Sequence, residues 1–430
     1  MFWEKNIETM APKALKALQL KRLKKTLESV SGNVPFYRDR LKAQGIKLAD
    51  IRSVDDIRRV PFTLIEDLRK NYPFGLLAVD KSKIARLHTS SGTTGKPKAI
   101  FFTRGDVDNS ANLIARCLVM TGVTNRDVFQ NMMSYGLFTG GLVMHYGAEK
   151  VGALVIPAAI GNTDRQIMLM RDFGTTSVHI TPSYALYLAD SMERSGVDPK
   201  KGLSLKRAYM GAEPHSEETR KKIEAAFGID VYNSYGLSEM NGPGVAFECP
   251  YKDGMHVWED NFILEIIDPK TNESLPDGAE GELVLTTLNR EGMPILRYRT
   301  RDLTRVLPGK CRCGRTHRRI ARITGRVDDM FIIRGVNVFP QQIERVLMGI
   351  KGVGRNYVIE LDSYDKLTVR VELDKGTAVN NVESLSVLKK EIEDKLRNEI
   401  LVRPKVELSE PGTLPVSEGK AKRVIDNRTI

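Results

Sequence analysis

A ten-residue segment in the first quarter of the chain concentrates groups that bind phosphate. Residues 89–98 read Thr-Ser-Ser-Gly-Thr-Thr-Gly-Lys-Pro-Lys and join two apolar runs at 84–87 and 99–102. A loop of glycines, hydroxyls and lysines offers backbone N–H groups, hydroxyl donors and positive charge to a polyanion. This composition predicts a phosphate-binding loop, and ATP is the ligand that we expect there. A flexible connector of the same composition is the alternative.

The spacing of the glycines distinguishes this loop from a P-loop. A P-loop has four residues between its first glycine and the Gly-Lys pair, and Ser or Thr follows that pair. Here two residues separate Gly92 from Gly95, and Pro97 follows Lys96. Because the residue before a proline disfavours helix, the loop does not lead directly into one. We expect a strand on each side of the loop.

Length and composition indicate a soluble protein of two or three structural units. The chain has 430 residues, of which 41% are hydrophobic and 28% are charged, and it exceeds the usual size of one hydrophobic core. The amino terminus lacks the apolar segment of a signal peptide, and no apolar run reaches the length of a membrane span. The four cysteines argue for a reducing compartment. We therefore expect a cytoplasmic protein with no membrane partner.

The net charge of +12 raises nucleic-acid binding as an alternative. The lysines are interspersed with acids, however, and no recognition motif with interleaved aromatic residues accompanies them. We therefore expect no nucleic-acid partner, and a field that attracts anionic substrates such as ATP or CoA is the functional interpretation. The sequence leaves the oligomeric state open, and a homodimer is among the alternatives.

The spacing of apolar residues predicts an α/β domain followed by a smaller α+β unit. Short β-rich runs alternate with amphipathic helical segments between residues 84 and 245, which indicates a largely parallel sheet. Residues 256–307 are rich in strand formers and turns, and they suggest an antiparallel subdomain. Beyond residue 328 we expect two strands, a helix at 383–400 and a last strand. We place the domains at 1–327 and 328–430.

The individual elements that we expect are as follows. The β-rich runs lie at 128–133, 153–156, 177–180, 207–210 and 231–235. The helical segments lie at 8–30, 36–45, 105–121, 163–173, 183–195 and 216–227.

Several other segments carry groups that suit a nucleotide site. Residues 232–239, Tyr-Asn-Ser-Tyr-Gly-Leu-Ser-Glu, combine an aromatic ring, a glycine and a carboxylate at a predicted strand end. Ligands bind at such edges of α/β sheets. Asp302 lies close to basic residues in the sequence, and its carboxylate could bind the two hydroxyls of a ribose. The alternative is that Asp302 is a structural acid held in a salt bridge. Further segments of this kind lie at 325–329, 334–340 and 414–423.

In this order, the segments resemble those of the adenylate-forming superfamily of acyl-CoA synthetases, luciferases and peptide-synthetase adenylation domains. A narrower resemblance is to the phenylacetate–CoA ligase family. It rests on residues 135–141, Tyr-Gly-Leu-Phe-Thr-Gly-Gly, and 145–149, His-Tyr-Gly-Ala-Glu, with 211–214, 256–260 and 311–316. The resemblance implies a large amino-terminal α/β domain with a β-rich subdomain. It also implies a small, mobile carboxyl-terminal α+β domain that carries the catalytic lysine.

The resemblance implies an AMP-forming ligase that works in two half-reactions. The carboxylate of phenylacetate or a related aryl acid attacks the α-phosphate of Mg-ATP, and CoA thiolate then displaces AMP from the acyl-adenylate. The alternative is a family member that acts on another acid or acceptor, such as a deazaflavin-coenzyme adenylating enzyme or a polysaccharide-biosynthesis homologue. A non-catalytic nucleotide-binding homologue is the alternative of another class.

The resemblance also assigns roles to single residues. Lys420 is the expected catalytic group, Glu239 the expected Mg²⁺ ligand, and Asp328 the expected hinge. Arg334 and Gly335 are expected to approach CoA. The residues expected to bind ATP or AMP are Ser90, Ser91, Gly92, Thr93, Thr94, Gly95, Lys96, Ala212, Glu213, Pro214, Asn233, Ser234, Tyr235, Gly236, Asp302 and Arg326.

The expected acyl pocket and a candidate metal site complete the set. The pocket residues are Tyr135, Phe138, Gly140, Gly141 and Ala148, and the alternative is that the two aromatic residues belong to the core. Three cysteines and one histidine form a common structural zinc set, here Cys249, His256, Cys311 and Cys313. Six residues separate the first two and one residue separates the last two, so the two halves must meet in space. His317 is the rival fourth ligand, and reduced, unligated cysteines are the alternative.

Overall fold

The chain forms two compact units. A computed structural model describes residues 1–89, 97–363, 366–374, 377, 382–415 and 421–428. Unit 1 comprises Met1–Ala159, Thr176–His179 and Tyr232–Arg322, and unit 2 comprises Ile160–Thr175, Ile180–Val231 and Ile323–Ile430. These units are defined by packing and each contains segments that are distant in sequence. The predicted domain boundary at residue 328 is a different division of the chain, and it stays a prediction.

The amino-terminal part of unit 1 is helical and leads to the hairpin beside the predicted phosphate loop. Its helices are α1 (Lys5–Glu8), α2 (Pro12–Asn33), α3 (Pro35–Ala43) and α4 (Ile65–Lys70), with 3-10 turns at Leu48–Asp50, Val54–Arg59 and Lys81–Lys83. Strand β1 (Ile84–Thr89) pairs antiparallel with β2 (Ala99–Thr103). A strand therefore stands on each side of the loop, as Pro97 predicted.

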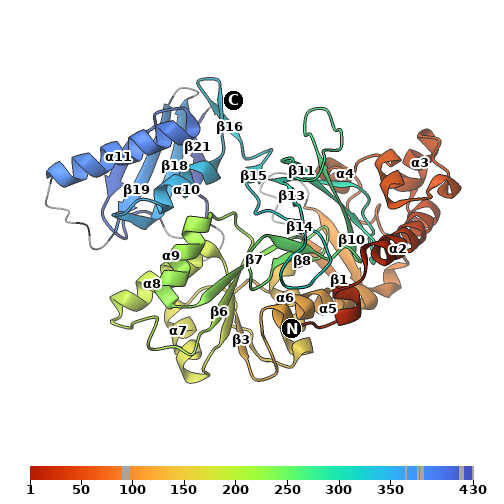
Figure 1. Cartoon of the computed structure of the whole chain (residues 1–430), viewed down its shortest axis with the longest axis horizontal. Coiled ribbons are helices and arrows are strands. Elements are labelled where there is room, and N and C mark those ends of the chain that lie inside the picture. Colours follow the sequence, from red (N-terminus) through yellow and green to blue (C-terminus); the bar gives the residue numbers. More distant parts are fainter. Residues whose placement is uncertain (90–96, 364–365, 375–376, 378–381, 416–420, 429–430) are drawn as a thin grey trace. The chain divides into compact units, whose positions relative to one another are not determined.

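The central part of unit 1 packs two helices beside parallel strands (Figure 1). Helix α5 (Arg104–Met120) contacts α6 (Thr139–Val151), and β3 (Val128–Asn131) pairs in parallel with β4 (Leu154–Ile156) and β5 (Ser177–Ile180). At the start of α5, the Thr103 hydroxyl accepts from the Asp106 N–H and the Asp106 carboxylate accepts from the Thr103 N–H. Parallel pairing confirms the sheet type predicted for these strands.

The rest of unit 1 is antiparallel. One set of strands has the order β13-β14-β9-β8-β7, and the other has the order β10-β11-β12. The first set is β7 (Asp230–Leu237), β8 (Gly242–Glu248), β9 (Met255–Val257), β13 (Val306–Leu307) and β14 (Arg319–Ile320). The second is β10 (Phe262–Ile267), β11 (Gly281–Thr287) and β12 (Tyr298–Thr304). Antiparallel pairing is therefore confirmed for strands in the predicted region 256–307, and the bounds of the subdomain stay a prediction.

Unit 2 joins a helical layer to an α+β segment. Its first part holds α7 (Thr163–Asp172), α8 (Pro182–Arg194), β6 (Arg207–Met210) and α9 (Glu217–Phe227). Its last part holds β15 (Gly325–Arg326), β16 (Phe331–Ile333), β17 (Val336–Val338), α10 (Pro340–Met348), β18 (Val353–Ser363), β19 (Lys366–Leu373), α11 (Val382–Ile400), β20 (Lys405–Ser409) and β21 (Val424–Asp426). The predicted succession of two strands, a long helix and a final strand is confirmed.

The carboxyl-terminal sheet of unit 2 has the order β20-β19-β18-β21 and is covered by α10 and α11 (Figure 1). Its buried core includes Ile343, Ile359, Val369, Ile392 and Leu396. Alternate residues of β19 supply this core because successive side chains of a strand point to opposite faces. Among the described residues, each helix is too short or too polar to cross a membrane.

Candidate active site

Glu239 lies at the centre of a buried polar cluster in unit 1. It follows the end of β7 and is 3% exposed. Its Oε1 accepts a hydrogen bond from the Lys98 ammonium and another from the Tyr298 hydroxyl, at 2.8 Å for the latter. Three segments that are distant in sequence therefore meet at one carboxylate.

This cluster keeps Glu239 ionised. Burial acts to raise the pKa of Glu239, but the charge of Lys98 and the hydrogen bonds from Lys98 and Tyr298 outweigh it, so that the pKa lies below its ordinary value. A buried, ionised carboxylate is a suitable ligand for a hard divalent cation. Sequence reasoning missed Lys98 and Tyr298, although both belong to segments that it singled out.

Tyr235 and Asp302 form a second polar pair in unit 1. The Tyr235 hydroxyl donates to Asp302 Oδ2 at 2.6 Å, and the Asp302 residue is 7% exposed. Gly236 lets β7 approach β8 here, because a Cβ at Gly236 would lie 1.7 Å from the carbonyl oxygen of Gly242. The Ser234 hydroxyl is buried with no hydrogen-bond partner among the described residues. The predicted nucleotide residues at this place thus provide an aromatic ring, hydroxyl groups, a carboxylate and a strand that lies close to its neighbour. They are Ser234, Tyr235, Gly236 and Asp302.

The predicted acyl-pocket residues lie around the start of α6. The Tyr135 hydroxyl accepts a hydrogen bond from Asn131 Nδ2 at 2.8 Å and contacts His145 Nδ1 at 3.2 Å. His145 Nε2 lies 3.0 Å from a carboxylate oxygen of Glu149. In the imidazole tautomer whose Nε2 proton bonds to that carboxylate, Nδ1 accepts from the Tyr135 hydroxyl. Burial raises the pKa of Tyr135 to about 12, so this hydroxyl stays protonated.

The other pocket residues differ in exposure. Phe138 is 44% exposed, so it is not an ordinary core aromatic residue, whereas Ala148 is fully buried. A Cβ at Gly141 would lie 2.2 Å from the carbonyl oxygen of Ser134, while a Cβ at Gly140 would meet no atom within 4 Å. Gly140 therefore has open space beside it, and Gly141 packs against backbone.

Unit 2 holds four further predicted nucleotide residues, Ala212, Glu213, Pro214 and Arg326. Glu213 Oε1 accepts from the Ala421 backbone N–H at 2.6 Å and from the Ser183 hydroxyl at 2.8 Å. Burial raises the pKa of Glu213, and these hydrogen bonds counter part of that effect. A cavity of about 410 Å³ within unit 2 is lined by Glu213, Pro214 and Asp328, among others. Ala212, which precedes Glu213, has a positive φ of 67°.

Two further predicted positions of unit 2 have defined local geometry. Arg326 Nε lies 2.9 Å from Asp328 Oδ1, and its Nη2 lies 3.2 Å from Oδ2, so the predicted ribose or phosphate contact pairs with the predicted hinge. Arg334 and Gly335 form the two-residue turn between β16 and β17, with φ of 50° and 78°. Positive φ at both positions is typical of a type I′ hairpin turn.

Two sets of predicted residues lie outside the described residues. They are the loop at 90–96 and the predicted catalytic residue Lys420. The described flank of the loop is anchored, because the Thr89 backbone N–H donates to the Leu137 carbonyl oxygen at 2.9 Å. Asn233, the remaining predicted position, donates its backbone N–H to Glu248 at 2.8 Å.

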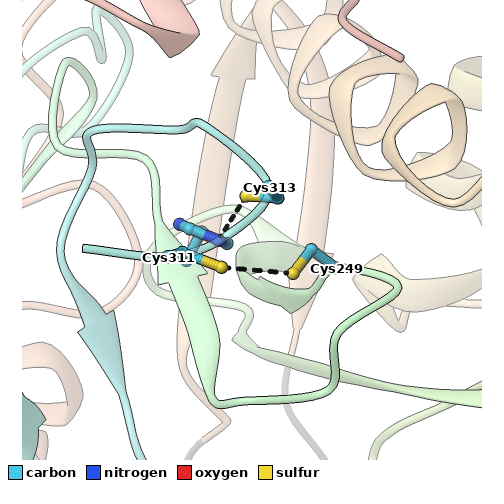
Figure 2. Close-up of side chains that lie close together, drawn as sticks. Cys249, Cys311 and Cys313 are labelled. Carbon is cyan, nitrogen blue, oxygen red and sulfur yellow. Dashed lines mark hydrogen bonds between the residues drawn. The ribbon is translucent and has the colours of Figure 1, made fainter. Parts of the chain in front are cut away.

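The two halves of the predicted metal site meet in unit 1 (Figure 2). Atoms of Cys249, His256, Cys311 and Cys313 that can ligate a metal all lie within 4.8 Å of one another. The sulfurs of Cys249 and Cys311 are 3.6 Å apart, and Cys313 Sγ lies 3.2 Å from His256 Nε2. Hydrogen bonds from Cys249 and His256 lower the pKa of the Cys313 thiol far below its ordinary value.

His317 is not the fourth ligand of this cluster. Its Nδ1 accepts from the Glu259 backbone N–H at 2.9 Å, so its Nε2 carries the proton that binds the Ile7 carbonyl oxygen at 3.0 Å. His256 has the opposite arrangement. Its Nδ1 donates to the His317 carbonyl oxygen at 3.2 Å, so Nε2 is the nitrogen that faces the sulfurs and that a metal could bind.

Comparisons with known proteins identify the family to which the chain belongs. A family model described as "AMP-binding enzyme" matches residues 12–289, and one described as "AMP-binding enzyme C-terminal domain" matches residues 335–428. A phenylacetate-coenzyme A ligase of Aromatoleum evansii is 48% identical over 428 residues, covering 98% of this chain and 96% of the relative. The chain belongs to the phenylacetate–CoA ligase family of AMP-binding enzymes. This membership confirms the resemblance found in the sequence.

Further relatives extend the comparison. A phenylacetate-coenzyme A ligase of Escherichia coli (strain K12) is 44% identical and covers 99% of this chain and 97% of the relative. Among solved structures, a 2-hydroxyisobutyryl-CoA ligase in the postadenylation state with R3-HIB-AMP has a TM-score of 0.94 at 29% identity. That match covers 99% of this chain and 92% of the neighbour. The predicted adenylate-forming fold is therefore confirmed.

Proposed function

We propose that this chain uses ATP to convert phenylacetate to its acyl-adenylate and then transfers the acyl group to CoA. The identity of 44–48% with four phenylacetate-coenzyme A ligases over nearly the whole chain carries this proposal. The products are phenylacetyl-CoA, AMP and pyrophosphate. Adenylation is chemically necessary because a carboxylate is a poor electrophile, whereas AMP is a good leaving group. A homodimer stays a prediction, which sedimentation equilibrium would test.

The polar cluster around Glu239 supports a role in binding Mg-ATP. Its carboxylate is buried and ionised, which fits the ligand preference of Mg²⁺. When bound, Mg²⁺ would neutralise charge on the phosphate oxygens. Lys98 already supplies one positive charge at this carboxylate and orients it together with Tyr298. In phosphoryl-transfer chemistry, positioned charges of this kind supply most of the transition-state stabilisation.

The pair of Tyr235 and Asp302 supports a role in holding the nucleoside. The hydrogen bond to Asp302 fixes the Tyr235 ring, which we propose stacks on adenine. The Asp302 carboxylate has two oxygens, and ribose hydroxyls can donate to them. The buried Ser234 hydroxyl supports the same proposal, because a bound ligand would supply the partner that the described residues do not.

Lys420 is the proposed catalytic residue of the first half-reaction, and Asp328 is the proposed hinge. A cation at Lys420 would stabilise charge on the substrate carboxylate and the α-phosphate in the adenylation transition state. Turning at Asp328 would then withdraw Lys420, and the hairpin turn at Arg334 and Gly335 would approach CoA. The Arg326–Asp328 ion pair supports a fixed starting position for this hinge.

The cysteine–histidine cluster is proposed to hold one structural zinc ion. In a tetrahedral site with Zn–S near 2.3 Å, two sulfurs lie about 3.8 Å apart and a sulfur lies about 3.6 Å from a nitrogen. The observed distances are close to these values. The sulfurs of Cys249 and Cys311 are 3.6 Å apart, and Cys313 Sγ lies 3.2 Å from His256 Nε2. Four protein ligands leave no position for a catalytic water, which favours a structural role.

The ligase proposal is tested by separating the two half-reactions. With ATP, CoA and phenylacetate, the purified protein should release AMP and pyrophosphate, and release of ADP and phosphate would contradict adenylation. Lys420→Ala should abolish pyrophosphate exchange yet leave thioester formation from synthetic phenylacetyl-adenylate largely intact. Lys422→Ala is the matched control, because this neighbouring lysine has no assigned role. Equal loss of both half-reactions in Lys420→Ala would contradict the role of Lys420.

A further inference from the structure

The residues that follow the metal cluster in sequence hold the amino terminus of the chain. We define residues 1–10 as the amino-terminal strap, and residues 311–317 as the anchor loop. Both lie in unit 1. The anchor loop begins with two of the proposed zinc ligands and contains no helix or strand. Its conformation therefore depends on side-chain contacts rather than on a hydrogen-bonded ladder.

Arg315 makes the strongest contact between the loop and the strap. Its Nε donates to Glu8 Oε2 at 2.7 Å, and its Nη2 donates to the Met1 carbonyl oxygen at 2.6 Å. The side chains of Arg315 and Glu8 are 2% and 0% exposed. The guanidinium also lies over the ring of Phe2, 4.6 Å from its centroid. A fully buried pair of this kind is sensitive to displacement, because moving Arg315 leaves the Glu8 carboxylate buried without its cation.

The next two residues bind the backbone of the strap. The Thr316 N–H donates to the Glu8 carbonyl oxygen at 3.1 Å, and its hydroxyl donates to the Met10 carbonyl oxygen at 2.7 Å. His317 Nε2 donates to the Ile7 carbonyl oxygen at 3.0 Å. Three consecutive residues that begin two positions after Cys313 thus satisfy backbone acceptors along the strap.

The cluster fixes the other end of this loop. Cys311 and Cys313 meet Cys249 and His256, which lie beyond β8 and on β9 (Figure 2). The two parts are also linked directly, since His256 Nδ1 donates to the carbonyl oxygen of His317. Without a cation, the three sulfurs repel one another when ionised, because their ligand atoms lie within 4.8 Å.

We propose that zinc at this cluster locks the amino-terminal strap onto unit 1 through the anchor loop, so that loss of the metal releases the strap. This inference rests on the zinc site in the proposed function. The strap is held on its other side by helix α5. There Trp3 Nε1 donates to Asn112 Oδ1 at 2.8 Å, and the Glu4 carboxylate accepts from Arg116 Nε at 2.6 Å. Release of the strap would therefore also remove a counter-charge from a buried arginine of α5.

The test is hydrogen–deuterium exchange of the full-length protein before and after zinc is removed with a thiol-reactive mercurial and a chelator. Zinc content is measured by mass spectrometry in parallel. We expect about one zinc per chain. Removal should speed amide exchange in residues 1–10 by about ten-fold or more, with little change in β18 and β19 of unit 2. Returning zinc after thiol reduction should restore protection.

Two variants separate the parts of the inference. Arg315→Met should keep full zinc content yet expose the strap to exchange. Cys117→Ala, which changes a buried cysteine outside the cluster, should keep both the zinc and the protection. Suppose that the protein holds one zinc per chain. The proposed coupling would then be overturned if the strap stayed protected from exchange after zinc removal, or if exchange rose equally in both units. A well-folded protein purified without zinc would overturn the site itself, and neither result bears on AMP formation.

Discussion

Substitution of Lys98 by methionine tests the electrostatic reasoning about the candidate site. The side chains of Lys98 and Glu239 are 12% and 4% exposed, so their ion pair is largely desolvated. Methionine has similar length and no charge. Among the described residues, the change leaves the buried Glu239 carboxylate with the Tyr298 hydroxyl as its remaining side-chain donor.

The magnitude follows from the burial of the pair. Removing one partner of a buried ion pair costs about 3–5 kcal/mol, and we take about 3 kcal/mol because Tyr298 remains. For a unit of this size, each kcal/mol lowers the thermal midpoint by about 2–4 °C, so we expect a fall of about 6–12 °C. The double variant Lys98→Met with Glu239→Gln should recover most of this loss, since no buried charge remains.

The pH dependence has a definite sign. In the wild type the lowered pKa of Glu239 stabilises the fold at neutral pH, and this contribution is lost as the pH falls through that pKa. In Lys98→Met, burial dominates and raises the pKa, so the ionised carboxylate destabilises the fold at neutral pH. The gap between the two proteins should therefore narrow as the pH falls toward 4.5, the ordinary value of a glutamate.

Differential scanning calorimetry without Mg²⁺, across this pH range, measures the effect. Lys201→Met is the matched control, because the Lys201 side chain is 86% exposed and its loss should leave the midpoint unchanged. A midpoint for Lys98→Met within about 2 °C of wild type at neutral pH would refute the reasoning. So would a loss that is the same at neutral and acidic pH.

Two other substitutions test the proposed nucleotide site, one through its packing and one through a hydrogen bond. Gly236→Ala places a Cβ 1.7 Å from the Gly242 carbonyl oxygen, so we expect a loss of about 2–3 kcal/mol in stability and weaker ATP binding by calorimetry. Gly32→Ala, where a Cβ meets nothing within 4 Å, should cost nothing. Tyr235→Phe keeps the ring but loses the hydroxyl bonded to Asp302, so KM for ATP should rise about five-fold, equivalent to about 1 kcal/mol. An unchanged KM would contradict the role given to that hydrogen bond.

Much of the fold could be predicted because its signals are local. The alternation of short strands and amphipathic helices is visible as periodicity, and the predicted strand at 207–210 matches β6 in both bounds. Helix α6 (Thr139–Val151) was not predicted. Its first turn contains Gly140 and Gly141, which lower helix propensity, and its stability comes from close packing on α5. There a Cβ at Gly147 would lie 2.2 Å from the side chain of Ile114.

The candidate site also has features that the sequence predicts and contacts that it does not. The meeting of Cys249, His256, Cys311 and Cys313 could be predicted, because three thiols and an imidazole form a common metal-binding set whatever the fold. The roles of Glu239 and Asp302 stay predictions. The contact of Lys98 with Glu239 joins residues 141 positions apart, and it depends on how β2 and β7 approach in three dimensions. The role of His317 depends on the backbone of the strap. Such long-range contacts leave no periodic signal in the sequence.

In the proposed first half-reaction, the carboxylate of phenylacetate attacks the α-phosphate of ATP. The most direct measurement uses phenylacetate labelled with ¹⁸O in both carboxylate oxygens, together with ATP and CoA. Attack at the α-phosphate transfers one carboxylate oxygen to the nucleotide, and displacement by thiolate leaves it there. We predict AMP that carries one ¹⁸O, and phenylacetyl-CoA that carries the other. Unlabelled AMP, or ¹⁸O in inorganic phosphate with release of ADP, would contradict attack at the α-phosphate.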